Sequence, residues 1–342
     1  MTRPLSIAIH GAGAVGSALA ARLMAADLPP EVSVTLIARG TRLGQLRKNG
    51  LSLTDLTGRI DVFPVAVAER AIRPVDILFL CVKGHAIADA LTEDLPYVTA
   101  ETAVIPLVNG IPWWYFADTA QTRAVSAVDP DGRLLSMLDS RQILGCVVYM
   151  TAELDAEGMV TAHSPHQLVI GPATGPITDT HKRVATFLEC AGVKTTLTPT
   201  IRETIWQKLT LNLATNPLSA LTGASVAQIS QDPALMSVAR AIADEVKATA
   251  HAWGAEVPGY EEFRTKLRLA GDFPTSMLQD ARAGRPLETG SICQAPLDLA
   301  AEAGVAMPLT RNIVHLLRHV APGCHSSQTL GEPHERPLSR IA

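Results

Sequence analysis

The chain has 342 residues, of which 47% are hydrophobic, and a formal net charge of −4 at pH 7. This length favours two domains, and the apolar content suffices for sizeable cores. Charges of both signs are interspersed and no basic stripe occurs, which argues against nucleic acid as a partner, and the apolar runs are too short to cross a membrane. The five cysteines are widely spaced and form neither a CxxC motif nor a Cys/His metal spacing. They indicate free thiols in a reducing cytosol and no metal site.

The first half of the chain alternates predicted strands with helices. Strands are predicted at 6–10, 32–38, 77–82 and 102–108. The last two are continuous apolar runs, which are typical of strands buried on both faces of a parallel sheet. After an excursion over 120–141 that turns at 129–132, shorter strands at 142–151, 158–161 and 167–170 are expected to finish the sheet.

A glycine-rich turn follows the first strand and precedes a helix-forming segment. It reads Gly11-Ala12-Gly13-Ala14-Val15-Gly16. In this context the pattern predicts a dinucleotide site: the first glycine permits the tight turn, the second leaves room for a pyrophosphate, and the third allows close helix packing. The helix N-terminus adds N–H groups and the positive end of its dipole. The alternative is a glycine-rich turn in an ordinary α/β protein.

The end of the second strand indicates which dinucleotide binds. It reads Ala38-Arg39-Gly40-Thr41-Arg42, without the acidic residue that usually holds a ribose 2′-hydroxyl. A guanidinium offers a planar fork of donors that suits a 2′-phosphate. We therefore predict NADP(H) as the cofactor, with Arg39 at its 2′-phosphate. The alternative is a solvated charge at the end of a strand.

After about residue 199 the pattern becomes helical. Asp232 is a predicted N-cap before Pro233, and apolar residues then recur every three to four positions as far as Gly254. Two more helices are expected near 291–303 and 310–320. The last twenty residues lack periodicity. The predicted fold is α/β, with a Rossmann-type dinucleotide-binding domain over 1–199, an all-helical domain over 200–322 and a flexible tail over 323–342.

Polar residues in three places are candidates for the chemistry. Lys83 and Asn109 follow the strands at 77–82 and 102–108, at the sheet edge where open α/β proteins bind ligands. Lys208, Asn212 and Asn216 are spaced at i, i+4 and i+8, so they share one face of a largely apolar helix. Such groups are costly to bury unless they face a polar cavity. The alternatives are a solvated lysine, a plain Asn-Gly turn and a structural polar network.

Two further features concern the same region. Pro217 is expected to perturb the helix just beyond these residues. Glu288, downstream of Ser276, could fold back toward Lys208 and complete an acid–base site, or it could be a solvated loop acid. Burial would lower the pKa of Lys208 and a nearby Glu288 would oppose that shift; either effect could dominate.

Together these segments resemble ketopantoate reductases, also called 2-dehydropantoate 2-reductases, from about residue 5 to 320. The likeness is carried by GAGAVG, CVK, VNG, WQKLTLNLATNPLSALTG and SMLQDARAGRPLE. The resemblance implies NADPH-dependent reduction of ketopantoate to pantoate, a precursor of pantothenate and coenzyme A. It implies that Lys208 is the general acid and that Glu288 fixes both substrate and lysine. It further implies substrate contacts at Asn212, Asn216 and Ser276, a bridge between nicotinamide ribose and substrate at Asn109, and Arg39 with Lys83 on the 2′-phosphate.

The chain departs from this family after Asn109-Gly110, where Ile-Pro is followed by Trp113, Trp114, Tyr115 and Phe116. We predict that the two tryptophans lie near the cleft between the domains and help to select the substrate; interdomain packing is the alternative. The excursion over 120–141 and the pair Gln294-Ala295 also depart. The competing functions are therefore a reductase of another 2-keto acid and an NADP-binding regulator without turnover. Because a regulator needs no acid, the presence of both Lys208 and Glu288 favours an enzyme. We further expect a small-molecule substrate, a cytoplasmic location and a homodimer.

Overall fold

A five-stranded parallel sheet forms the centre of the first half of the chain, in the computed structural model that describes residues 5–119 and 122–319. Its strand order is β5-β2-β1-β6-β7, and every neighbouring pair is parallel. The strands are β1 (Leu5–His10), β2 (Val32–Ile37), β5 (Val67–Ala68), β6 (Val75–Leu80) and β7 (Val98–Pro106). Because β1 lies between β2 and β6, its carboxyl end and the glycine turn lie in the middle of the sheet, where α/β folds bind ligands.

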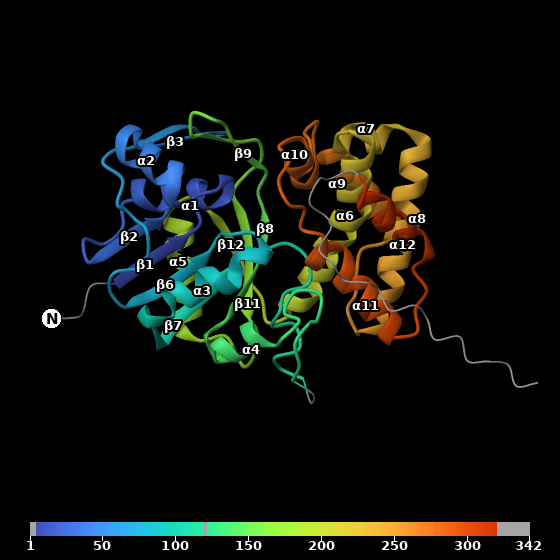
Figure 1. Cartoon of the computed structure of the whole chain (residues 1–342), viewed down its shortest axis with the longest axis horizontal. Coiled ribbons are helices and arrows are strands. Elements are labelled where there is room, and N and C mark those ends of the chain that lie inside the picture. The colour runs from blue at the N-terminus through green and yellow to red at the C-terminus, as the bar shows by residue number, and fades with distance from the viewer. Residues whose placement is uncertain (1–4, 120–121, 320–342) are drawn as a thin grey trace, which may run out of the picture.

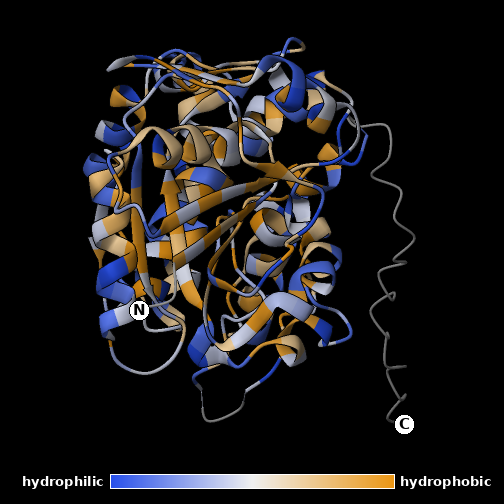
Figure 2. Ribbon diagram, turned by 90° about the vertical axis from the view of Figure 1, so that its left-hand side faces the viewer, coloured by the Kyte–Doolittle hydropathy of each residue, from blue (hydrophilic) through white to orange (hydrophobic). Residues whose placement is uncertain are grey.

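Alternate side chains of these strands pack on opposite faces of the sheet. Ile7 and Ile9 of β1 pack in one buried cluster with Leu19 of α1 (Ala14–Ala25). Ala8 packs in the other with Leu91 of α3 (Ile87–Asp94). Burial on both faces explains the continuous apolar runs of the sequence, and the strands are accordingly coloured mainly as hydrophobic in Figure 2. Helix α2 (Gly40–Asn49) follows β2 directly.

Two smaller sheets correct one expectation. The strands predicted at 142–151, 158–161 and 167–170 do form, but they do not finish the parallel sheet. One sheet has the order β4-β3-β10-β9 and the other β12-β11-β8. A single parallel bridge, Val104 to Ile143, links β7 to the segment just before β8. The elements are β3 (Leu51–Asp55), β4 (Gly58–Val62), α4 (Arg133–Met137), β8 (Leu144–Tyr149), β9 (Ala152–Leu154), β10 (Met159–Ala162), β11 (Gln167–Pro172), α5 (Asp179–Cys190) and β12 (Lys194–Leu197).

From α6 (Ile201–Thr222) onward the described chain is helical, and Figure 1 shows these helices on the right, beside the sheet domain. Helix α8 (Pro233–Ala252) begins as predicted, because the Asp232 carboxylate accepts N–H bonds from Ala234 and Leu235 at 2.8 and 3.0 Å. The fold class is therefore confirmed. The remaining elements are α7 (Val226–Gln231), α9 (Tyr260–Leu269), α10 (Ser276–Arg282), a π-helical turn (Gly290–Gln294), α11 (Ala295–Glu302) and α12 (Pro308–Leu317).

Helix α6 is the central element of this half, since it packs on α8, α10, α12 and β8. Pro217 lies inside it, and the helix continues five residues further to Thr222 before Gly223 closes it at φ 74°. The expected perturbation therefore does not interrupt the helix. The turn around Pro217 is buried among other helices, and tertiary packing outweighs the intrinsic cost of the proline.

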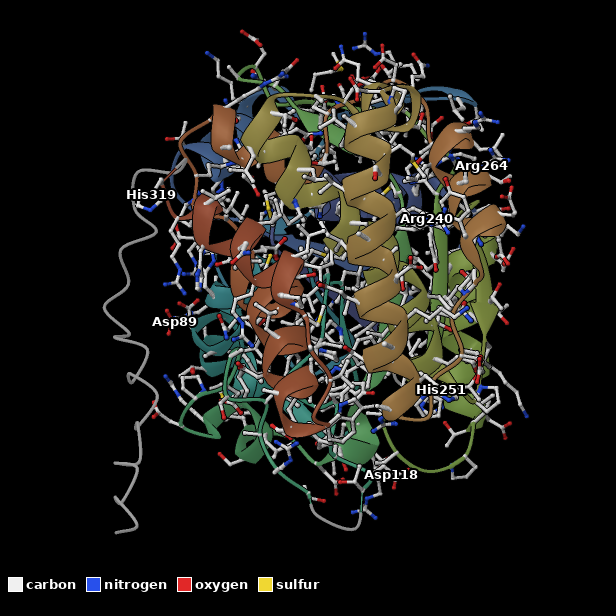
Figure 3. All side chains as sticks on the ribbon, turned by 90° about the vertical axis from the view of Figure 1, so that its right-hand side faces the viewer. Asp89, Asp118, Arg240, His251, Arg264 and His319 are labelled. Carbon is white, nitrogen blue, oxygen red and sulfur yellow. The ribbon has the colours of Figure 1, made fainter. Side chains whose placement is uncertain are left out.

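The outer face of the helical half is charged. Figure 3 shows Arg240, His251 and Arg264 on this side, and Arg264 pairs with Glu261 at 2.6 Å. Within residues 5–119 and 122–319, no helix combines the length and the apolar character needed to cross a membrane. The tail predicted over 323–342 lies outside the described residues.

Candidate active site

The glycine turn after β1 has the geometry that a dinucleotide needs. Gly11 has φ +115°, and a Cβ there would come within 2.6 Å of the Cys81 carbonyl oxygen. A Cβ on Gly16 would lie 1.9 Å from the Gly11 carbonyl oxygen. A Cβ on Gly13, by contrast, would meet nothing within 4 Å, and no side chain caps the α1 N-terminus that follows. Gly11 and Gly16 close the turn, and Gly13 leaves an open approach to backbone N–H groups for a pyrophosphate.

A cavity of about 540 Å³ opens beside this turn, over the ends of β1 and β2. Its walls include Gly11, Ala12 and Gly13 on one side and Arg39, Thr41 and Arg42 on the other. Its size and its guanidinium groups fit the adenosine half of a dinucleotide that carries a 2′-phosphate. Arg42 also braces the glycine turn, because its Nε donates to the Ala12 carbonyl at 3.2 Å and its Nη2 to the Ser17 hydroxyl at 3.1 Å.

A second cavity, of about 420 Å³, lies on the other side of the turn, between the sheet domain and the helices. Val15 of the turn lines it. So do five residues singled out from the sequence, which come from the end of β7, from α6 and from the start of α10: Asn109, Lys208, Asn212, Asn216 and Ser276. Asn216 is buried and Ser276 is exposed at the rim. The helical spacing therefore places these polar groups around one cavity.

Lys208 is held against the sheet domain. Its Nζ donates to Asn109 Oδ1 at 2.7 Å and to the Val148 carbonyl, and it lies 5.6 Å from the centre of the Tyr149 ring. Burial lowers the pKa of Lys208 to about 8, although the charge of Glu288 acts in the opposite direction. The sequence left open whether burial or the charge of Glu288 dominates the pKa of Lys208; in the structure burial has the larger effect. The ammonium is thus a stronger acid than an ordinary lysine, and it can release a proton near neutral pH.

Glu288 does not pair directly with Lys208. Its carboxylate lies 3.3 Å from Lys83 Nζ and accepts the Gly84 N–H at 3.2 Å. Lys83 also donates to Asp280 at 2.6 Å. Burial disfavours the Lys83 charge, but the two carboxylates outweigh it, so the pKa of Lys83 is raised. The contact predicted from the sequence is replaced by an ion-pair cluster between the domains, because Lys83 follows β6 on the side that faces α10.

This position of Lys83 also corrects its expected role. Lys83 does not line the cavity that contains Arg39, and its ammonium is engaged by Asp280 and Glu288. The expectation that it shares a 2′-phosphate with Arg39 does not fit this geometry. Arg42, which the sequence shows three positions after Arg39 and which received no role from the sequence, is the second guanidinium at that cavity. Asp280 was also missed, although it belongs to the SMLQD segment.

The four consecutive aromatic residues form part of the core. Trp113 and Trp114 are each 1% exposed, and neither lines the 420 Å³ cavity. The Tyr115 hydroxyl accepts a 2.7 Å bond from Trp206 Nε1, and the Phe116 ring packs 5.3 Å from that of Trp253. Trp114 does line a small pocket of about 10 Å³ beside Asn109 and Lys208, so it lies near the cleft as predicted, but neither tryptophan reaches the larger cavity, and a role in substrate selection stays a prediction. These side chains join the sheet domain to α6 and α8, which was the alternative.

Comparison with known proteins identifies the family of the chain. The family model described as "Ketopantoate reductase PanE/ApbA" matches residues 7–175, and its C-terminal counterpart matches residues 200–321. A 2-dehydropantoate 2-reductase of Mesorhizobium japonicum is 32% identical, over 94% of this chain and 100% of its own. A solved structure assigned as a ketopantoate reductase of Ralstonia solanacearum MolK2 superimposes with a TM-score of 0.83 at 30% identity, covering 92% of this chain and 96% of its own.

A further solved structure shows how far the fold extends. A D-mandelate dehydrogenase in a ternary complex with NADH and anilino(oxo)acetate has a TM-score of 0.79, covering 92% of this chain and 98% of its own. At 19% identity it shows the fold alone. The family models and the 32% identical relative, by contrast, span nearly the whole described chain and include the segments on which the resemblance was based. The chain belongs to the ketopantoate reductase PanE/ApbA family.

Proposed function

We propose that this protein reduces 2-dehydropantoate to pantoate with NADPH. The observation that carries the proposal is the 420 Å³ cavity, in which a partly buried lysine of lowered pKa faces the same space as Asn109, Asn212, Asn216 and Ser276. Val15 of the dinucleotide turn lines that cavity too. A nicotinamide and a small keto acid can therefore meet there. We take ketopantoate as the substrate from the names of the 32% identical relative and of the family.

The cofactor fits the first cavity. Open space over Gly13 and the uncapped N-terminus of α1 suit a pyrophosphate, and Arg39, Thr41 and Arg42 suit a 2′-phosphate. No acidic residue ends β2 to receive a ribose 2′-hydroxyl. These features support NADPH over NADH. When bound, the nicotinamide supplies the hydride that adds to the keto carbon.

Lys208 supplies the proton in this mechanism. Its Nζ proton passes to the ketone oxygen as the carbonyl carbon is reduced, so negative charge does not accumulate on that oxygen. Asn109 accepts a hydrogen bond from the ammonium and holds it at the cavity wall. Asn212 and Asn216, one and two turns further along α6, provide donors and acceptors for the hydroxyl and carboxylate of the substrate, together with Ser276 at the rim. Glu288 acts from a distance, because its charge sustains the protonated form of Lys208.

A second candidate substrate class is favoured by one observation. The same cavity has an apolar side formed by Leu211, Val226, Leu269 and Phe273. Such a side fits a 2-keto acid with a larger apolar group than ketopantoate. The reaction and the roles of Lys208 and Asn109 would be the same.

One experiment separates the two candidates. Initial rates of NADPH consumption are measured with ketopantoate and with a panel of 2-keto acids that carry branched or phenyl groups, and the product is identified. Ketopantoate with the highest kcat/KM, and pantoate formed in equal amount to the NADPH consumed, would support the proposal. A phenyl-substituted acid with at least a tenfold higher kcat/KM would favour the second candidate, and no turnover of any acid would overturn both.

A further inference from the structure

A buried histidine and a buried aspartate lie directly beneath the cofactor cavity. His10 is the last residue of β1, 4% exposed, and it lines the 540 Å³ cavity. Its Nδ1 lies 2.6 Å from a carboxylate oxygen of Asp94, the last residue of α3, which is fully buried. Its Nε2 lies 3.1 Å from Nη2 of Arg39. The three side chains thus form a continuous hydrogen-bonded chain from the interior to the cavity.

The direction of these hydrogen bonds follows from the chemistry of the groups. A guanidinium can only donate, so His10 Nε2 must accept from Arg39. The ring proton is then on Nδ1, where it is donated to Asp94. The second oxygen of Asp94, Oδ1, is buried without a hydrogen-bond partner among residues 5–119 and 122–319. The carboxylate is therefore directed at the histidine ring, and it selects the tautomer that presents an acceptor to Arg39.

Packing alone does not explain this pair. The neighbouring residues of β1, Ile9 and Ala8, are apolar, and an apolar residue at position 10 would avoid the cost of burying an imidazole and a carboxylate. Buried polar groups that are retained at such a cost are commonly found at sites of function. Within the described part of the chain, the polar contact that connects this pair to the cavity is the one to Arg39.

Arg39 has two different partners at the cavity. Arg39 Nη2 also contacts Glu93. The Arg39 side chain is 49% exposed and the Glu93 side chain 40%. An exposed ion pair of this kind contributes little and is readily exchanged for another anion. The bond to His10 lies on the buried side. An incoming phosphate can therefore replace Glu93 while His10 continues to hold the guanidinium, whose remaining N–H groups are donors for the phosphate.

We propose that His10 and Asp94 are positioning residues that set the preference for a 2′-phosphorylated cofactor by orienting Arg39. This inference rests on the proposed use of NADPH. A guanidinium held in place before the ligand binds loses less conformational freedom in binding, so preorganisation appears as affinity. Although His10 also lines the cavity, its acceptor Nε2 is occupied by Arg39, so the effect should fall mainly on ligands that carry the 2′-phosphate.

Two substitutions of His10 separate positioning from packing. An asparagine places its amide near the position of Nδ1, so His10→Asn keeps a donor for Asp94 but loses the acceptor for Arg39. A glutamine reaches the position of Nε2, so His10→Gln keeps that acceptor. Binding of 2′,5′-ADP and of 5′-AMP to the full chain is measured by calorimetry, with thermal unfolding of each variant as the control for folding.

The expected result is specific to one ligand. His10→Asn should raise the Kd of 2′,5′-ADP about tenfold, since one hydrogen bond to a charged group is lost, and should leave the Kd of 5′-AMP within about twofold. His10→Gln should retain most of the affinity for 2′,5′-ADP. A full preference for 2′,5′-ADP in His10→Asn, or an equal loss for both ligands, would overturn the positioning role. If the unmodified protein bound both ligands equally, the proposed use of NADPH would fail as well, whereas a lack of ketopantoate turnover would leave the binding result unaffected.

A second measurement needs no variant. In protein labelled with ¹⁵N-histidine, the ring nitrogens of His10 report which of them carries the proton. We expect an unprotonated Nε2 and a protonated Nδ1. A ring protonated on Nε2, or on both nitrogens, at pH 7 would contradict the proposal, because no acceptor would then face Arg39.

Discussion

Raising the pH from 7 to 9 should lower the kcat/KM for the keto acid about tenfold, if Lys208 is the proton donor. With a pKa of about 8, Lys208 is about nine-tenths protonated at pH 7 and about one-tenth protonated at pH 9. A lysine with an ordinary pKa near 10.5 would lose almost none of its charge over that range. The size of the pH effect therefore reports the burial of this side chain, not merely its presence.

The direction of the effect follows from the surroundings of Lys208. The partners of its Nζ, Asn109 Oδ1 and the Val148 carbonyl, are neutral, so they stabilise the ammonium less than a carboxylate would. Glu288 contributes its charge from a distance while it is paired with Lys83. Burial therefore prevails and lowers the pKa below that of the unfolded chain, and the protonated, catalytically competent form is lost as the pH rises through about 8.

The assay follows NADPH absorbance at saturating NADPH and limiting keto acid. In the reverse direction, with NADP⁺ and the hydroxy acid, the rate should rise through the same pH, because neutral Lys208 then accepts the proton. Lys208→Arg is the matched control: a guanidinium keeps its charge across this range, so the pH dependence should disappear at a reduced rate. Lys208→Ala should cut turnover about 10²–10⁴-fold and leave NADPH binding intact.

Two results would refute this reasoning. A flat profile up to pH 10 in the unmodified protein would mean that the pKa is not lowered or that proton transfer does not involve Lys208. Near-normal turnover of Lys208→Ala at saturating keto acid would remove Lys208 from the mechanism. If Lys208→Ala lost NADPH binding instead, the residue would have a structural role between the domains.

Three further substitutions test other parts of the site. Arg39→Ala should raise the KM for NADPH by an amount equivalent to about 1.5–3 kcal/mol and leave the use of NADH nearly unchanged, as steady-state rates with both cofactors would show; equal losses would contradict the 2′-phosphate role. Lys83→Met should reduce keto acid turnover yet keep the ratio of NADPH to NADH use, because its contacts are Glu288 and Asp280, and a collapse of that ratio would restore it to the cofactor site. Trp114→Ala should destabilise the protein to urea by about 3–5 kcal/mol without changing the ranking of keto acids, and a changed ranking would return this residue to the pocket.

The local elements of the fold could be predicted from the sequence. The continuous apolar runs correspond to β6 and β7, and the Asp232-Pro233 pair marks the start of α8. Both signals depend only on neighbouring residues. The pairing of β3 with β10 joins segments about a hundred residues apart, and no local pattern specifies it. In the third sheet β11 pairs with β8 and β12, its neighbours along the chain, but the sequence pattern does not show that these strands form a sheet separate from the parallel one.

In the candidate site, too, features that depend on local spacing could be predicted, whereas contacts between distant segments could not. Asn212 and Asn216 follow Lys208 at helical spacing, so the helix alone brings them to one face, and the structure places that face on a cavity. The partner of Glu288 could not be predicted from the sequence, because both Lys83 and Lys208 were possible partners, and in the structure Lys83 pairs with Glu288 and with Asp280. The positions of Trp113 and Trp114 could not be predicted either, because the Trp114 ring packs against Gly145 of β8, where the missing side chain leaves room for it.

The pKa of Lys208 shows why the last step from residues to chemistry requires the fold. The sequence identifies both opposing influences, an apolar helix and a downstream glutamate, but their balance depends on distance and solvent access. In the folded chain, Glu288 contacts Lys83 and the Gly84 N–H, whereas Lys208 contacts Asn109. Because Glu288 is paired with Lys83, burial dominates at Lys208 and lowers its pKa to about 8, so the ammonium is mostly protonated at pH 7 and can still release its proton. A direct ion pair between the two residues would hold that proton more tightly and give a poorer acid.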